Sequence, residues 1–140
     1  MDSLQPFHAL VGEILMYCQM IEHDVKEIYA SRAGGDYSKN LASLKEQKTT
    51  MGQTVTKLKE LDRALSKPLF SQKDYDLLFQ IVSKRNYYAH EAYLSFVYVI
   101  GEVEVDFAYQ QAYQKAYYDK QKLSALYEAV EDVRLSIVDF

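Results

Sequence analysis

An arginine, an asparagine and a histidine lie close together in the middle of the chain, within the run KRNYYAHE at residues 84–91. Their side chains suit acid–base chemistry on a phosphate. A guanidinium binds two phosphate oxygens at once, and an imidazole that titrates at about pH 6.5 takes up or releases a proton. A carboxamide can orient that imidazole through a hydrogen bond. Arg85, Asn86 and His90 are therefore the first candidates for a functional site.

A helix is expected to carry these residues. Ser71 and Asp74 have the spacing of a helix start, and a stripe of helical spacing follows: Tyr75, Leu78, Phe79, Val82, Asn86, Ala89 and Tyr93. This pattern places Asn86 and His90 together on the apolar face, with Arg85 about 100° round the helix. Because an unsatisfied buried amide or imidazole costs roughly 1–3 kcal/mol, the pair must bond inside the protein or line a wet groove.

The whole chain is predicted to fold as an all-α antiparallel bundle of four to five helices, a single domain over residues 1–140. Only five glycines and two prolines occur in 140 residues. A sandwich or barrel is excluded because it needs a turn signal every 8–12 residues or so. The few breaks are far enough apart for long helices, and they fall at Pro6, Gly34, Gly35, Pro68 and Gly101.

The breaks and the apolar spacing place the other helices. We expect a first helix from Leu4 up to Gly34 and a polar connection over residues 34–50, with room for a helical turn at residues 41–45. A capping box formed by Thr50 and Gln53 predicts a second helix that stops before Pro68. The β-prone residues 96–101 interrupt the helical order, which resumes from residue 106 to the end.

Composition excludes several classes of protein. The single cysteine, Cys18, lies on the apolar stripe of the first helix, where we expect a small buried hydrophobe and no disulfide or nucleophile. No stretch approaches the roughly 18 uncharged apolar residues that a membrane span requires. With no basic leader, the chain is expected to be cytoplasmic. His8 and His23 are separated by roughly 22 Å of helix, too far for one ion, and no metal or cofactor is predicted.

The net charge of −4 disfavours tight non-specific binding to nucleic acid. Charge is unevenly distributed, however, since residues 26–85 carry 12 basic and 7 acidic side chains. This region either presents a basic face to an anion or forms a solvated helix surface of mixed charge. The sequence leaves both interpretations open.

The segment RNYYAH at residues 85–90 resembles the Arg-x4-His motif of the HEPN superfamily, in the form in which Asn directly follows Arg. HEPN domains are compact bundles of four or five helices, and the motif lies at or near the end of a later helix. The resemblance implies a metal-independent endoribonuclease for single-stranded RNA. In that reaction a base deprotonates the ribose 2′-OH, whose oxygen attacks the adjacent phosphate and leaves a cyclic phosphate on the upstream fragment.

The resemblance also implies roles for the three residues. By motif position, His90 is the general acid/base, Arg85 the phosphate clamp and Asn86 the group that orients the imidazole. In the family, two protomers usually bring their motifs together across a two-fold cleft. A homodimer is therefore implied, with RNA as its substrate.

Aromatic and basic side chains next to the motif are candidates for RNA binding. Lys84 can pair with phosphate, and Tyr87 and Tyr88 can stack on unpaired bases or equally contribute to a dimer interface or the core. Later tyrosines alternate with Gln and Ala, as on a half-exposed helix face, and are expected mainly in an interface or the core; these are Tyr109, Tyr113, Tyr117 and Tyr118.

The family places such chains in toxin–antitoxin or phage-defence systems, where an antitoxin protein is a further partner. In the subgroup paired with a nucleotidyltransferase antitoxin, the motif continues as His-x-Tyr. Here Glu91 and Ala92 follow the histidine, and the tyrosine comes one position late, at Tyr93. Tyr93 is therefore predicted to be a core or interface residue.

Some HEPN proteins are not nucleases, which gives the alternative function. In that case the chain is a non-catalytic helical module for dimerisation or protein interaction. Arg85 would then pair with an acid such as Asp74 or Glu91. Asn86 and His90 would form hydrogen bonds within the bundle.

Overall fold

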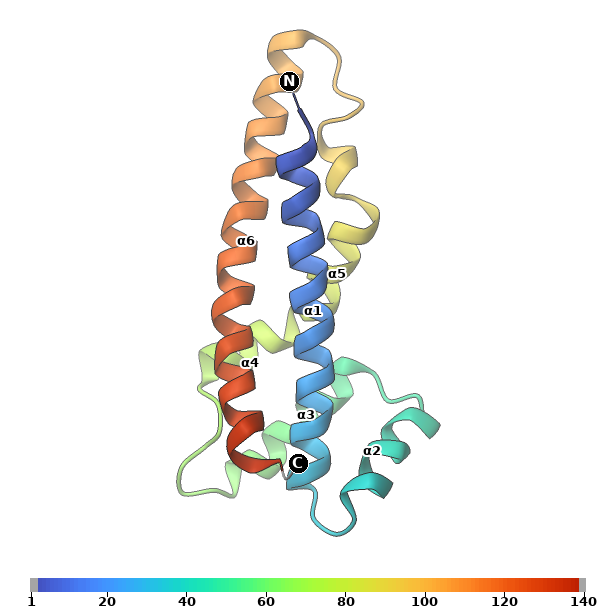
Figure 1. Ribbon diagram of the computed structural model, residues 1–140, viewed down its shortest axis with the longest axis vertical. Helices are drawn as coiled ribbons and strands as arrows, with labels where there is room; N and C mark the ends of the chain where they lie inside the picture. Colours follow the sequence, from blue (N-terminus) through green and yellow to red (C-terminus); the bar gives the residue numbers. More distant parts are fainter. Residues whose placement is uncertain (1–2, 139–140) are drawn as a thin grey trace.

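The computed structural model describes residues 3–138, an elongated bundle of helices joined by short connections (Figure 1). The two longest helices, α1 (Gln5–Arg32) and α6 (Glu102–Ile137), lie side by side along the molecule. Three shorter helices pack against α1, namely α2 (Tyr37–Glu46), α3 (Met51–Arg63) and α5 (Ile81–His90). Helix α4 (Gln72–Phe79) packs against α3 and α5, and the 3₁₀ helix η1 (Ala92–Ser95) packs against α5 and α6. No strand occurs in residues 3–138. The prediction of an all-α bundle is confirmed.

Local sequence signals set the helix starts. The capping box is confirmed at α3, where the Thr50 hydroxyl accepts from the Gln53 N–H at 3.1 Å and the Gln53 side chain accepts from the Thr50 N–H at 2.9 Å. Ser71 caps α4 through the Asp74 N–H at 3.1 Å. The predicted connection over residues 34–50 contains a further helix, α2, which Asp36 caps. These caps satisfy backbone donors that the first turn of a helix leaves free.

The helix expected to follow Ser71 is divided at Gln80, which separates α4 from α5. The Gln80 N–H bonds to the carbonyl of Leu77, three residues back, so the turn tightens and α5 takes a new direction. In α5 the buried side chains are Ile81 and Tyr88. The inward face of α5 therefore differs from the one that an unbroken stripe predicts.

The core is formed mainly by the inward stripe of α1, which includes the fully buried Cys18. Near the start of α1, the ring of Phe7 meets Tyr93 and Phe96 edge to face, with ring centroids 5.1 and 5.2 Å apart. Tyr93 thus packs against the core, as predicted. Burial raises the pKa of the Cys18 thiol to about 11, so the thiol stays protonated and is no nucleophile.

The turn before α6 depends on one glycine. Gly101 caps the helix with φ of 102°, in the region that favours glycine. A Cβ there would lie 1.9 Å from a carboxylate oxygen of Glu104. This turn holds the connection between η1 and α6 in its exposed position.

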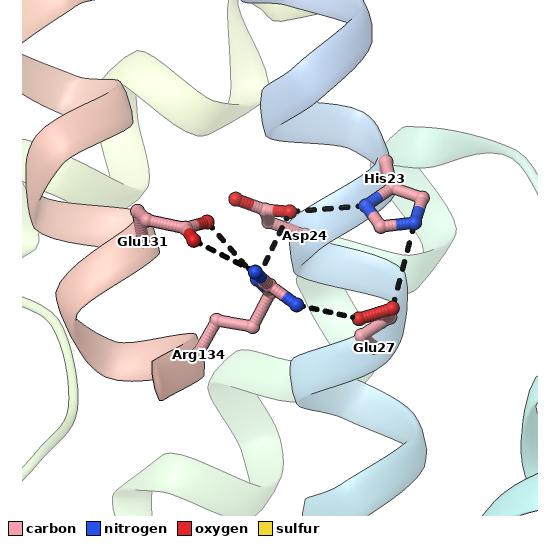
Figure 2. A network of polar contacts seen from close by, with 5 residues as sticks. All are labelled: His23, Asp24, Glu27, Glu131 and Arg134. Carbon is pink, nitrogen blue, oxygen red and sulfur yellow. Dashed lines mark hydrogen bonds and ion pairs between the residues drawn. The ribbon is translucent and has the colours of Figure 1, made fainter. Parts of the chain in front are cut away.

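Near its C-terminal end, α6 is joined to α1 by a cluster of charged groups (Figure 2). The guanidinium of Arg134 bonds to Glu27 at 3.0 Å and to Glu131 at 2.7 Å, and its Nε lies 3.3 Å from Asp24. His23 lies 3.0 Å from Asp24 on the outer side. We call these five residues the Arg134 cluster.

None of the helices in residues 3–138 combines the length and apolarity needed to cross a bilayer.

Candidate functional site

Arg85 faces α1 and is partly buried. Its Nη1 donates to the Glu22 carboxylate at 2.5 Å. The expectation that Arg85 pairs with an acid is confirmed, but the partner is neither Asp74 nor Glu91. Glu22 belongs to α1, and only the packing of α5 against that helix brings the two groups together.

Asn86 and His90 lie on the solvent-facing side of α5, about 100° and about 140° round the helix from Arg85. Both are exposed, and in residues 3–138 neither side chain has a hydrogen bond or an ion pair. The prediction that they lie on the apolar face is wrong, because Ile81 and Tyr88 take that face once α5 is separated from α4. Exposure removes the desolvation cost and leaves both side chains available to a ligand.

Lys84 and Tyr88 point to a buried carboxylate, that of Asp119 in α6, which is 5% exposed. Lys84 lies 2.8 Å from one oxygen and Lys115 lies 2.9 Å from the other, to which the Tyr88 hydroxyl also donates. Burial raises the pKa of Asp119, but these three donors outweigh it and hold the pKa below its ordinary value. Lys84 and Tyr88 are therefore engaged inside the bundle.

These groups form one charged cluster where α1, α5 and α6 meet, which we call the Asp119 cluster. It contains Lys84, Arg85 and Lys115 as cations, Glu22 and Asp119 as carboxylates, and the Tyr88 hydroxyl. Three cations face two carboxylates, so the cluster carries one surplus positive charge. Lys115 is its exposed member.

A groove runs between α5–η1 and α6, with a volume of about 640 Å³, and we call it the α5–α6 groove. It is lined by Tyr87, Ser95, Ala108, Gln111, Ala112, Gln114, Lys115 and Tyr118. A second hollow of about 510 Å³ adjoins it along α6 and shares Gln111, Gln114 and Tyr118. Of the three predicted RNA-binding side chains, only Tyr87 lines this groove. Sequence reasoning missed the glutamines, although they lie between the tyrosines that it singled out.

An exposed apolar surface begins one helical turn after His90. We call it the apical apolar surface, and it consists of Leu94, Val97, Tyr98, Val99, Ile100, Val103 and Phe107. Ile100 is 91% exposed. Seven exposed large hydrophobic side chains within residues 94–107 are typical of an interaction site. Exposed acids alternate with these residues along the chain, among them Glu102 and Glu104.

In residues 3–138, no group of three or more His, Cys, Asp or Glu residues is arranged to hold a metal ion. The exposed end of α5 offers an imidazole and an amide, with the guanidinium of Arg85 close by. Comparison with known proteins gives no match to a family model, a curated protein or a solved structure.

Proposed function

We propose that this chain is a metal-independent, HEPN-type ribonuclease that cleaves single-stranded RNA as a homodimer. The observation that carries the proposal is the state of Asn86 and His90. Both are exposed on the last turns of α5, neither has a partner in residues 3–138, and Arg85 is adjacent. Exposed polar groups with no structural partner are candidates for binding and catalysis.

The three side chains can divide the chemistry between them. The His90 imidazole takes the proton from the ribose 2′-OH, and the Asn86 amide, four residues earlier on the same face, orients it. Only Nη1 of Arg85 bonds to Glu22. The remaining N–H donors of the guanidinium can contact the phosphate and stabilise its added negative charge in the transition state.

A homodimer accounts for the apical apolar surface. A second copy would cover side chains such as Ile100 and Val103 and bring a second His90 near the first, since this surface starts one turn after the histidine. By the same resemblance, we place the protein in a cytoplasmic toxin–antitoxin or phage-defence system with an antitoxin as its partner.

The second candidate is a non-catalytic interaction module with the same fold. Two observations favour it. Glu22 neutralises Arg85, and acids such as Glu102 and Glu104 flank the apical apolar surface, which suits a protein partner better than RNA. In this case the dimer forms and RNA is not cleaved.

Cleavage of single-stranded RNA in the presence of EDTA tests the choice. We expect the wild type to release fragments that end in a 2′,3′-cyclic phosphate. His90→Ala should lower the rate about 100-fold or more, because it removes the acid/base. His23→Ala, at an exposed histidine of the Arg134 cluster, is the matched control and should cleave at the wild-type rate.

Equal rates for His90→Ala and the wild type would remove His90 from the mechanism. Ile100→Asp provides the second measurement, because a charge in the apical apolar surface should convert the dimer to a monomer in light scattering. If the wild type is a dimer that leaves RNA intact, the interaction module is the better description.

A further inference from the structure

We propose that the α5–α6 groove is a nucleotide-binding subsite that takes one unpaired base of an RNA strand and the phosphate next to it. The base stacks on Tyr118, and its edge is contacted by Gln111 and Gln114. Lys115 contacts the phosphate. This inference rests on the proposed ribonuclease function, because it names the part of that site that holds the substrate. Its evidence is the lining of the groove.

The aromatic part of the groove combines an open ring with a fixed one. The Tyr118 side chain is 53% exposed and contacts only Tyr117 among the rings of residues 3–138, at 6.0 Å between centroids. Across the groove, Tyr87 is held edge to face against Tyr88 at 5.0 Å, with Lys115 Nζ 4.6 Å from its centroid. Stacking is tolerant of base identity because every base has a π face. Tyr118 therefore supplies the stacking surface and Tyr87 a rigid wall.

The amides of the groove can read the edge of a base. Gln111 and Gln114 are exposed, lie three residues apart on one face of α6, and have no hydrogen bond in residues 3–138. A carboxamide offers both a donor and an acceptor, which matches the alternating pattern on the edges of bases.

The charge of the groove suits an anion. Lys115 is half-exposed at the groove and shares Asp119 with Lys84. The Asp119 cluster behind it has one surplus positive charge, counting Arg85 and Glu22. The ammonium of Lys115 can therefore meet a phosphate without losing its buried partner.

The volume and the position of the α5–α6 groove also suit a nucleotide. A volume of about 640 Å³ lies in the range of small-molecule sites, roughly 300–1,000 Å³. Tyr87 directly follows Asn86 and precedes His90 by three residues, so the groove borders the exposed polar face of α5. A base held there places its own 2′-OH and phosphate next to that face. The adjoining hollow along α6 offers room for a second nucleotide.

Binding of RNA without cleavage tests the subsite. In a His90→Ala background, fluorescence anisotropy with fluorescein-labelled hexamers of A, C and U measures affinity. Tyr118→Ala should weaken binding about tenfold, whereas Tyr118→Phe keeps the ring and should stay within about twofold. Gln111→Ala should weaken binding about fivefold and change the ranking of the three hexamers. Gln19→Ala, at an exposed glutamine of α1, is the matched control.

The possible outcomes test the nucleotide-binding subsite separately from the ribonuclease activity. Groove-dependent binding by a chain that does not cleave RNA supports the subsite and contradicts the ribonuclease. Cleavage with equal affinity for all variants overturns the subsite and leaves the ribonuclease standing. The subsite is also overturned if the hexamers do not bind, or if Tyr118→Ala changes the oligomeric state in light scattering while RNA affinity stays the same, since the groove would then contact protein.

Discussion

Two aspartates are buried between the long helices, and their carboxylates have opposite surroundings. Asp119 is 5% exposed and Asp24 is 4% exposed. Both oxygens of Asp119 accept bonds, from Lys84, Lys115 and Tyr88. In residues 3–138, Oδ2 of Asp24 has no hydrogen-bond partner. Burial alone therefore does not decide the charge of a carboxylate; the balance of donors around it does.

The Arg134 cluster has too few donors for its carboxylates (Figure 2). Asp24, Glu27 and Glu131 share one guanidinium, and His23 lies at the exposed edge. Burial and, to a smaller extent, the neighbouring Glu131 carboxylate together raise the pKa of Asp24 to about 6. The bonds from Arg134 and, to a smaller extent, the neighbouring Asp24 side chain lower the pKa of Glu131 to about 2. Below about pH 6 the pair therefore keeps a proton on Asp24, whereas the pKa of Asp119 is held below its ordinary value.

The largest expected effect comes from Asp119→Asn. The amide cannot accept from Lys84, Lys115 and Tyr88 as a carboxylate does, and two ammonium groups lose their counter-charge. We expect the free energy of unfolding at pH 7 to fall by about 3 kcal/mol, measured by urea denaturation. Asp132→Asn removes an exposed acid of the same helix and should change it by less than about 0.5 kcal/mol. Equal effects of the two substitutions would contradict the role given to the Asp119 cluster.

An aspartate-to-asparagine substitution in the Arg134 cluster should change the free energy of unfolding in the opposite direction. At pH 8 Asp24 is ionised although burial and the nearby Glu131 disfavour that charge. The neutral amide of Asp24→Asn removes this cost and can donate to Glu131. We expect the free energy of unfolding at pH 8 to rise by about 1–2 kcal/mol, measured by urea denaturation. A loss of stability at pH 8 would show that the ionised carboxylate is the stabilising form.

The pH profile gives the control for Asp24. Its folded pKa of about 6 lies above the ordinary value of 3.8, so the folded state binds more protons between these values. Stability should therefore decrease as pH rises from about 4 to 6, and this slope should be absent in Asp24→Asn. His23→Gln should keep the slope, which separates Asp24 from the imidazole beside it. Besides its five members, Tyr37 and Tyr127 also face the cluster.

The fold was largely predictable because its signals are local. The capping residues Thr50, Gln53 and Ser71 act within three residues, and the α1 stripe repeats at a helical spacing. The break at Gln80 was not predictable, since the stripe on either side continues in register. That break determines which face of α5 is buried, so the error in placing Asn86 and His90 followed from it.

The candidate site was predictable only in part. Arg85 is 63 residues from Glu22, and Lys84 is 35 residues from Asp119. Such pairs depend on how helices pack, which no local pattern specifies. A signal for the buried aspartates did exist, because Asp24 and Asp119 lie in register with the apolar stripes of α1 and α6. A charged residue on such a stripe indicates a buried polar cluster.

The smallest expected change in stability comes from Glu22→Gln, a substitution that also distinguishes the two proposed functions. Glu22→Gln leaves Arg85 without its carboxylate and raises the surplus of the Asp119 cluster from one positive charge to two. Because the pair is partly exposed, we expect a loss of only about 1 kcal/mol in the free energy of unfolding. If Arg85 binds phosphate, affinity for an RNA hexamer in the His90→Ala background should increase about threefold, with a steeper dependence on salt. If the chain is an interaction module, the stability loss should occur without any change in RNA affinity, because Glu22 would serve only to hold α5 on α1.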